Sequence, residues 1–305
     1  METETKKNSK HVFKGFRLLK NPFALLFYIV IIIYTLSLLI PCAWMIISSL
    51  RPSGQFTDAP FGIPKTINLN NYLLVFQKLR TPIDPLKGRG SWVYMPQLML
   101  NGVLYAALCT AASLCMQILV SYGVAKYNSI AGKILYGFAI VTMILPLVGT
   151  MPARLLLYKN LNIYDNFIGI VIASAGWGGS NFLILHATFK GVPEEYREAA
   201  FMDGASHFRV LLTIMIPMIR TTILALFILG FIGAWNDYQT PMVYMPNMPT
   251  IAYGLFQYVR SSDSDVSGIP MQITGCVVVM VPIMILFIVF RNQIMGNLAM
   301  GGIKG

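Results

Sequence analysis

Polar side chains inside the apolar stretches of this chain are the first candidates for chemistry. Lipid does not solvate such groups, so they are functional candidates by default. Aromatic rings stack on the apolar faces of sugars, and amides and carboxylates bond sugar hydroxyls, so the densest set suits an uncharged glycan. We interpret it as a substrate pathway: Trp177, Asn181, Trp235, Asn236, Asp237, Tyr238 and Gln239. Trp177 and Trp235 fit a membrane interface equally well. Asp237 also fits a hydrogen bond between helices, or a position outside the hydrocarbon.

A second candidate is the segment 191–220, which holds four of the chain's twelve acidic residues. Pro193 fits the first position of a helix, and the glutamates that follow lie in its first turns, where the helix dipole favours anions. Gly204 can take the left-handed conformation that ends a helix, and Ser206 can cap a second one. The sequence therefore predicts a helix, a glycine hinge and a second helix, held parallel to the membrane.

An enzyme within the membrane would need a nucleophile with a base, or a set of metal ligands. His186 has no carboxylate or cysteine at helical spacing, and the four cysteines lie in apolar runs without metal-ligand spacing. The sequence contains no H-E-x-x-H, no G-x-S-x-G and no P-loop motif G-x-x-x-x-G-K-[ST]. We therefore predict that the chain is not an enzyme, holds no metal or cofactor, and does not bind ATP by that motif.

The composition indicates that a bilayer replaces water around much of the chain. Of its 305 residues 56% are hydrophobic and 11% are charged, against about 25% charged in a soluble domain. The net charge of +11 is not arranged in an aromatic-laced stripe, which argues against nucleic acid. It fits basic residues on the cytoplasmic side, facing anionic lipid. The first apolar run begins too late and is too long for a cleaved signal peptide, so it is an anchor.

Six apolar stretches are long enough to cross a membrane, which takes about 20 residues. They are Phe27–Ile47, Asn101–Ala125, Ile134–Leu157, Phe167–Phe189, Thr221–Tyr244 and Ile273–Phe290. Pro146 and Pro282 fall within them as tolerated kinks. The sequence thus predicts an all-α membrane protein with six transmembrane helices.

Six spans place both ends on one side, and the basic residues indicate which. The two ends and the second and fourth loops hold 14 of the 23 basic residues, and six of the others lie in the long loop Arg51–Gln97, which constrains orientation less. Both termini of this multi-pass membrane protein are therefore predicted to be cytoplasmic. Within the basic tail, residues 1–22, His11–Lys20 fits an amphipathic helix on the membrane or an ordinary basic segment before the anchor.

The second candidate segment resembles the "EAA" loop of ABC import permeases. Glu198-Ala199-Ala200 is followed at the family's spacing by Gly204, Ile214 and Pro217, in a cytoplasmic loop between the fourth and fifth spans. The resemblance implies a coupling helix that docks onto a separate ATPase, with Glu198 as polar anchor and Gly204 as hinge. The implied docking residues are Glu195, Glu198, Ala199, Ala200, Asp203, Gly204, Ile214 and Pro217. Paired alanines expose backbone, so a partner's groove can approach closely. The alternative is a helical hairpin that only rests on the membrane.

Other motifs look like carbohydrate permeases of the maltose-transporter type. They are Ser49-Leu50-Arg51, Asn70-Asn71-Tyr72, Trp235-Asn236-Asp237-Tyr238 and the glycine-rich ending Met300–Gly305. The resemblance implies a type I ABC importer permease fold in a bacterial plasma (inner) membrane. It also implies three kinds of partner: a second, different permease subunit, an ATPase dimer and an extracellular solute-binding protein. It also implies that the ending reaches toward the ATPase dimer, or is simply a disordered end. The loop Met245–Gln272 would reach into the binding protein, or is a plain connection.

These observations predict the permease subunit of an ATP-driven importer of a sugar or oligosaccharide. Its parts would be the tail 1–22, a permease domain 23–290 (core 98–290, coupling loop 191–217) and a cytoplasmic tail 291–305. The companion subunit can supply most substrate contacts in such a family. The alternative is a permease for a polyamine, an anion or a peptide-like solute, although no basic residues converge at mid-membrane as an anion carrier would need.

Overall fold

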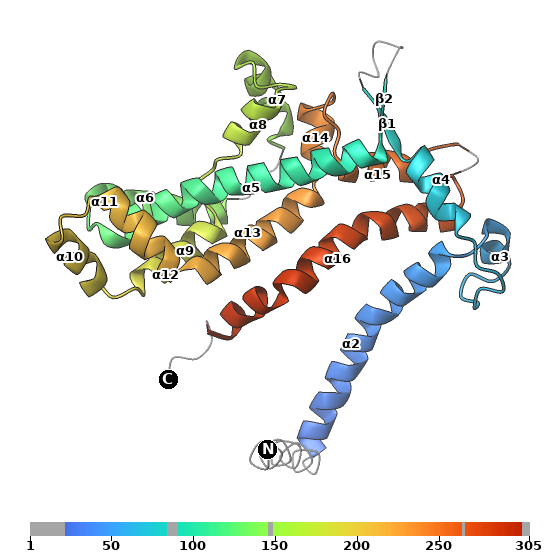
Figure 1. Cartoon of the computed structure of the whole chain (residues 1–305), viewed down its shortest axis with the longest axis horizontal. Coiled ribbons are helices and arrows are strands. Elements are labelled where there is room, and N and C mark those ends of the chain that lie inside the picture. Colours follow the sequence, from blue (N-terminus) through green and yellow to red (C-terminus); the bar gives the residue numbers. More distant parts are fainter. Residues whose placement is uncertain (1–21, 84–90, 146–148, 264–265, 301–305) are drawn as a thin grey trace. The chain divides into compact units, whose positions relative to one another are not determined.

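The structure is a computed structural model, and it describes residues 22–83, 91–145, 149–263 and 266–300, with side-chain surroundings as far as Arg291 (Figure 1). The predictions for the basic tail, for Pro146 and for the glycine-rich ending 301–305 fall on residues outside this description. The chain forms two compact units, Met1–Tyr72 with Gly268–Val277 and Leu73–Ser267 with Val278–Gly305.

The described chain is almost entirely helical (Figure 1). One short antiparallel hairpin pairs β1 with β2, with Thr81 opposite Val93. The elements are α2 (Pro22–Ser49), α3 (Ser53–Asp58), α4 (Asn70–Lys78), β1 (Arg80–Pro82), β2 (Trp92–Tyr94), α5 (Met95–Lys126), α6 (Ile130–Ile144), α7 (Met151–Asn160), α8 (Phe167–Ala173), α9 (Ser180–Lys190), α10 (Glu195–Met202), α11 (His207–Val210), the π-helix η1 (Leu211–Met215), α12 (Ile216–Met218), α13 (Arg220–Trp235), α14 (Gln239–Tyr244), α15 (Ile251–Val259) and α16 (Ile269–Met300).

Three of the six predicted spans are confirmed as continuous helices. Helices α2, α5 and α16 are each long and apolar enough to cross a membrane. A fourth span is completed only if the bent pair His207–Met218 and Arg220–Trp235 counts as one. Helix α16 continues past the predicted end of the sixth span to Met300, so residues 291–300 of the predicted tail are helical.

The other three predicted spans are interrupted, so none of them is a single continuous helix in the described chain. The third is divided between α6 and α7, with Gly149 at φ 77° between them. The fourth stops at Ala173 and resumes at Ser180, after Gly179 at φ 94°. Residues other than glycine rarely adopt such angles, and a helix cannot continue through them. The fifth stops at Trp235 and resumes at Gln239.

Two of the sequence motifs meet in the first unit, where they bond each other. The amide nitrogen of Asn71 donates to the carbonyls of Ser49 and Arg51, both at 2.9 Å. The hydroxyl of Tyr72 lies 2.7 Å from that of Ser49, and the hydroxyl of Thr274 donates to the Ser49 carbonyl at 3.0 Å. These bonds satisfy backbone groups freed at the end of α2. The motifs therefore hold the end of the first membrane helix to α4.

Arg51 is buried at 2% exposure and also acts on backbone. Its guanidinium donates to the carbonyls of Gln55, Ala59 and Pro60 at 2.6–3.0 Å, and it lies 5.6 Å from the ring centre of Phe56. A planar fork of donors suits several carbonyls at once. Arg51 thereby closes the turn that carries α3.

In the second unit, α5 is the central helix and packs against both α9 and α13 (Figure 1). Gly230 on α13 permits the close approach, because a Cβ there would lie 2.7 Å from Cγ2 of Thr110 on α5. At the other end, a Cβ on Gly254 of α15 would lie 2.7 Å from Cδ1 of Leu98. Small residues at helix contacts are the usual means of close packing in membranes.

We predict that Asn71→Ala destabilises the protein, whereas Asn70→Ala does not. Asn71 is buried, and its loss removes the side-chain donor of the Arg51 carbonyl and one of the two donors of the Ser49 carbonyl, which costs about 2 kcal/mol. Asn70 begins the same helix but is exposed, so it is the matched control. Thermal unfolding of the purified protein in detergent measures the difference. Equal midpoints for Asn71→Ala and wild type would contradict the role assigned to this motif.

Candidate functional site

The segment between α9 and α13 forms the predicted helix, glycine hinge and second helix. Gly204 follows α10 at φ 78°, and the Ser206 hydroxyl accepts from the Arg209 amide at 3.4 Å, as an N-cap of α11. One detail was wrong. Pro193 lies outside the helix, and Glu194 is the N-cap residue before α10. We call residues 194–218 the transverse segment, because His207–Met218 meets α13 at 79°.

A wide turn precedes Pro217 within the transverse segment. Residues Leu211–Met215 form a π-helix, in which the amide of Ile216 donates to the carbonyl of Leu211. Pro217 has no N–H to offer the carbonyl four residues earlier, and its ring would clash with that carbonyl. A wider turn removes the clash. Ile214 lies in this turn, half-buried against the hydrophobic core.

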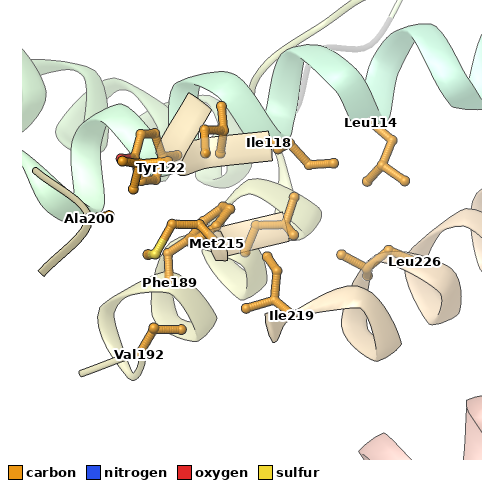
Figure 2. Packing of buried hydrophobic residues seen from close by; sticks show 12 residues of the cluster. Leu114, Ile118, Tyr122, Phe189, Val192, Ala200, Met215, Ile219 and Leu226 are labelled. Carbon is orange, nitrogen blue, oxygen red and sulfur yellow. The ribbon is translucent and has the colours of Figure 1, made fainter. Parts of the chain in front are cut away.

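One face of the transverse segment is fixed by a hydrophobic cluster (Figure 2). Met215 and Ala200 point into it, together with side chains from the ends of α5 and α9. Its buried members are Leu114, Ile118, Tyr122, Leu185, Phe189, Val192, Ala200, Val210, Leu211, Met215, Ile219 and Leu226. The interpretation that both alanines face a partner is therefore wrong for Ala200, whose side chain is 7% exposed and packs inside this chain.

The opposite face of the transverse segment is open. Glu198, Ala199 and Asp203 are exposed there, as is Gly204. Two large apolar side chains that the sequence analysis missed accompany them, since Met202 is 89% and Phe208 is 62% exposed. Exposed apolar groups beside charged ones are typical of a surface that a partner covers.

Lys126 joins the end of α5 to the start of the transverse segment. Its ammonium donates to the carbonyl of Val192 at 2.7 Å and to Oε2 of Glu194 at 3.1 Å. The Lys126 side chain is only 5% exposed, so its charge depends on these partners. Arg197 forms a second ion pair with Glu194. We call this set of contacts the Lys126 tether.

An aromatic contact strengthens the same junction. The hydroxyl of Tyr127 lies 2.7 Å from Nδ1 of His207 on α11. Arg197 lies 5.2 Å from the ring centre of Tyr127 and 5.5 Å from that of Phe201. This junction is not predicted from the sequence. The sequence feature that indicates it is the pair Lys126 and Tyr127 at the end of an apolar helix.

The surroundings of Glu194 lower its pKa. Partial burial alone would raise it, but the hydrogen bond from Lys126 and the charges of Lys126 and Arg197 lower the pKa below its usual value. The stability that this carboxylate contributes is therefore present above its unfolded-state pKa. It is lost as the pH falls through the lower folded-state pKa.

Most of the predicted pathway residues at the end of α13 have partners within the chain. Trp235 is 2% exposed and stacks on Phe231 at 6.1 Å between ring centres. Asp237 lies in the turn between α13 and α14 and accepts from the Tyr105 hydroxyl of α5 at 2.9 Å. Tyr238 stacks on Phe256 at 4.4 Å.

The remaining pathway residues are placed separately. Asn236 donates to the carbonyl of Ile232, Gln239 begins α14, and Trp177 packs edge-on against Phe182. Asn181 alone among the predicted set lines the pocket that lies between α5, α9 and α13. The structure therefore does not bring the two predicted clusters together.

This pocket has a volume of about 190 Å³. Its lining residues are Cys109, Thr110, Ser113, Leu114, Gln117, Ser174, Asn181, Leu226, Gly230 and Ala234. Sequence reasoning missed Thr110, Ser113 and Gln117. Their spacing of three and four residues places them on one face of α5, and that periodicity was the available signal.

Comparison with known proteins decides the family. Residues 117–300 match the family described as "Binding-protein-dependent transport system inner membrane component". The chain belongs to this family. It is therefore a multi-pass permease subunit of an ABC importer, a transport component and not an enzyme. The matched range includes the last part of α5 from Gln117, the whole transverse segment and the pocket residues from Gln117 onward.

Relatives cover most of the chain at low identity. The arabinooligosaccharides transport system permease protein AraQ of Bacillus subtilis is 23% identical over 88% of this chain and 91% of its own length. The trehalose transport system permease protein SugB of Mycobacterium tuberculosis is 22% identical over 88% and 93%. A bacterial ABC transporter involved in the import of the acidic polysaccharide alginate shares the fold, with a TM-score of 0.72 at 22% identity over 88% of this chain and 95% of that one.

We predict that Lys126→Met loosens the transverse segment. The variant should lose about 1 kcal/mol of stability at neutral pH, a modest value because Glu194 is partly exposed. The loss should shrink in acid, once Glu194 is protonated in both proteins. Thermal unfolding at several pH values measures this. Lys190→Met is the control, because Lys190 is an exposed lysine in the last turn of α9. A deficit that does not depend on pH would contradict the assigned ion pair.

Proposed function

We propose that this permease subunit imports a sugar or oligosaccharide delivered by an extracellular solute-binding protein. The transverse segment is the observation that carries the importer part of this proposal. Its inner face is packed against α5, and its outer face is exposed, so that a partner can bind there. The sugar class is supported by the printed names of relatives, which include transporters of arabinooligosaccharides, diacetylchitobiose and trehalose. It is also supported by the uncharged side chains that line the pocket.

The proposed topology has six spans with both termini in the cytoplasm. Three continuous helices supply spans one, two and six, and the broken ranges supply the other three. Irregular backbone at membrane depth is tolerated where protein buries it or where it lines a cavity. The basic residues of the ends and of the second and fourth loops support this orientation. The parts proposed are a tail 1–22, a permease domain 23–290 and a C-terminal part 291–305.

The proposed ATPase-docking surface is the exposed face of the transverse segment. Glu195, Glu198, Ala199, Asp203 and Gly204 would contact the ATPase, with Met202 and Phe208 as apolar contacts. Ala200 and Ile214 would act from inside by holding the segment against its core. Pro217 would set the wide turn before α13.

The proposed mechanism is alternating access driven by the ATPase dimer. ATP binding closes the dimer and displaces the docked transverse segment. The hydrophobic cluster and the Lys126 tether transmit that displacement to α5, which lines the pocket. A second permease subunit completes the path, and hydrolysis resets it. Packed elements of this kind move as units rather than deforming continuously.

We predict that Glu198→Lys abolishes coupling while the protein still inserts. Reversing a charge at a docking surface places like charges together and costs several kcal/mol. The assay is ATP hydrolysis by the assembled transporter with its binding protein. In the wild-type complex, trehalose, arabinotriose or diacetylchitobiose should stimulate hydrolysis, and spermidine or sulfate should not.

Lys133→Glu is the control for this experiment, because it reverses an exposed charge on α6 outside the transverse segment. Full stimulation in the Glu198→Lys complex would falsify the docking surface. Stimulation of the wild-type complex by spermidine or sulfate alone would contradict the sugar assignment while leaving the docking surface intact.

A further inference from the structure

The pocket between α5, α9 and α13 has the composition of a ligand site. We propose that it binds one ring of a neutral sugar, so that this subunit itself contacts the substrate during import. The inference rests on the proposed sugar import and adds the residues that would recognise the sugar. They are Gln117 and Ser113 on α5, with Thr110 and Asn181 beside them.

Gln117 supplies the deciding observation. It is only 6% exposed, and its amide nitrogen donates to the Ser113 hydroxyl at 3.1 Å and to the Gly178 carbonyl at 3.4 Å. Within the described part of the chain, its buried oxygen Oε1 has no hydrogen-bond partner. Leaving such an atom unpaired costs about 1–3 kcal/mol. This oxygen has almost no accessible surface, so a ligand hydroxyl in the pocket would satisfy it once the Gln117 side chain rotates toward the pocket.

The break between α8 and α9 adds backbone groups to the same wall. The carbonyls of Gly176 and Gly178 turn toward Ser113 and Gln117. The Ser174 hydroxyl donates to the Val171 carbonyl at 2.6 Å and lies 3.3 Å from the Cys109 carbonyl of α5. A helix interrupted at membrane depth exposes polar backbone that must be satisfied. The interrupted backbone lies beside the polar pocket, so its carbonyls can hold the side chains that line the pocket.

The size and charge of the pocket restrict the ligand class. A volume of about 190 Å³ is below the range of about 300–1,000 Å³ that holds drug-sized ligands, so it suits one ring rather than a whole chain. The polar lining groups are hydroxyls and amides, which match hydroxyls and would leave a carboxylate or sulfate without a counter-charge. Leu114 and Leu226 provide an apolar wall for a ring face.

The test uses the assembled transporter in proteoliposomes with its binding protein. Uptake of radiolabelled trehalose, arabinotriose and diacetylchitobiose is measured alongside stimulated ATP hydrolysis. Gln117→Leu should lower uptake about tenfold, the equivalent of one good hydrogen bond, with stimulated hydrolysis unchanged. Ser113→Ala, which keeps Gln117, should lower uptake less. Ser121→Ala is the control, because Ser121 is a buried serine of α5 that bonds its own helix and does not line the pocket.

The outcomes separate the two proposals. Wild-type uptake by both Gln117→Leu and Ser113→Ala would show that the pocket holds only water, and would overturn this inference alone. Equal losses of uptake and of ATP hydrolysis would assign Gln117 to packing, and would also overturn it. If the wild-type transporter imports none of the three sugars but responds to spermidine or sulfate, the proposed sugar import fails and this inference falls with it.

Discussion

The bond from Lys126 to the backbone of Val192 and the carboxylate of Glu194 is the interaction on which the proposed mechanism depends. A loop that docks onto an ATPase is useful to a membrane protein only if its displacement reaches the spans. Here a nearly buried ammonium ends the central helix and holds the start of the loop. A buried charge without a partner is very costly, so the two elements separate only with difficulty.

The hydrophobic cluster gives the same junction its rigidity. Met215 and Ala200 fill the space between the ends of α5 and α9, and truncation of such side chains leaves cavities that are costly in close-packed interiors. The two faces of the transverse segment thus have different tasks. The inner face binds it to this chain, and the outer face, with Met202 and Phe208, remains open.

Much of this arrangement could be predicted from the sequence because it is local. The spacing of Glu198, Gly204 and Ser206 predicts a helix, a left-handed glycine and a capped second helix, and the backbone has all three. Long unbroken apolar runs likewise predict α2, α5 and α16. Other apolar runs have the same hydropathy but are interrupted at glycines such as Gly179. Hydropathy does not predict these interruptions, because it contains no information on backbone angles.

Features set by contacts between distant segments could not be predicted. Lys126 and Glu194 are far apart in the chain, and neither residue type alone indicates the other. The inward orientation of Ala200 depends on which side of α10 meets α5. Trp235 looked like a ligand-binding aromatic and is instead buried against Phe231. Gln117 was overlooked because one amide in an apolar helix is ordinary until its neighbours are known.

The most direct test of the central claim is the distance between spin labels at Tyr196 on α10 and Leu119 on α5, both exposed positions. It is measured in the assembled transporter without nucleotide and with ATP trapped. A second label pair, between Leu119 and the companion permease, reports that the transporter has switched. The account predicts that the Tyr196–Leu119 distance stays the same in both states while the distance between subunits changes. A change in the Tyr196–Leu119 distance on switching would show that the transverse segment moves independently of α5, which contradicts the account.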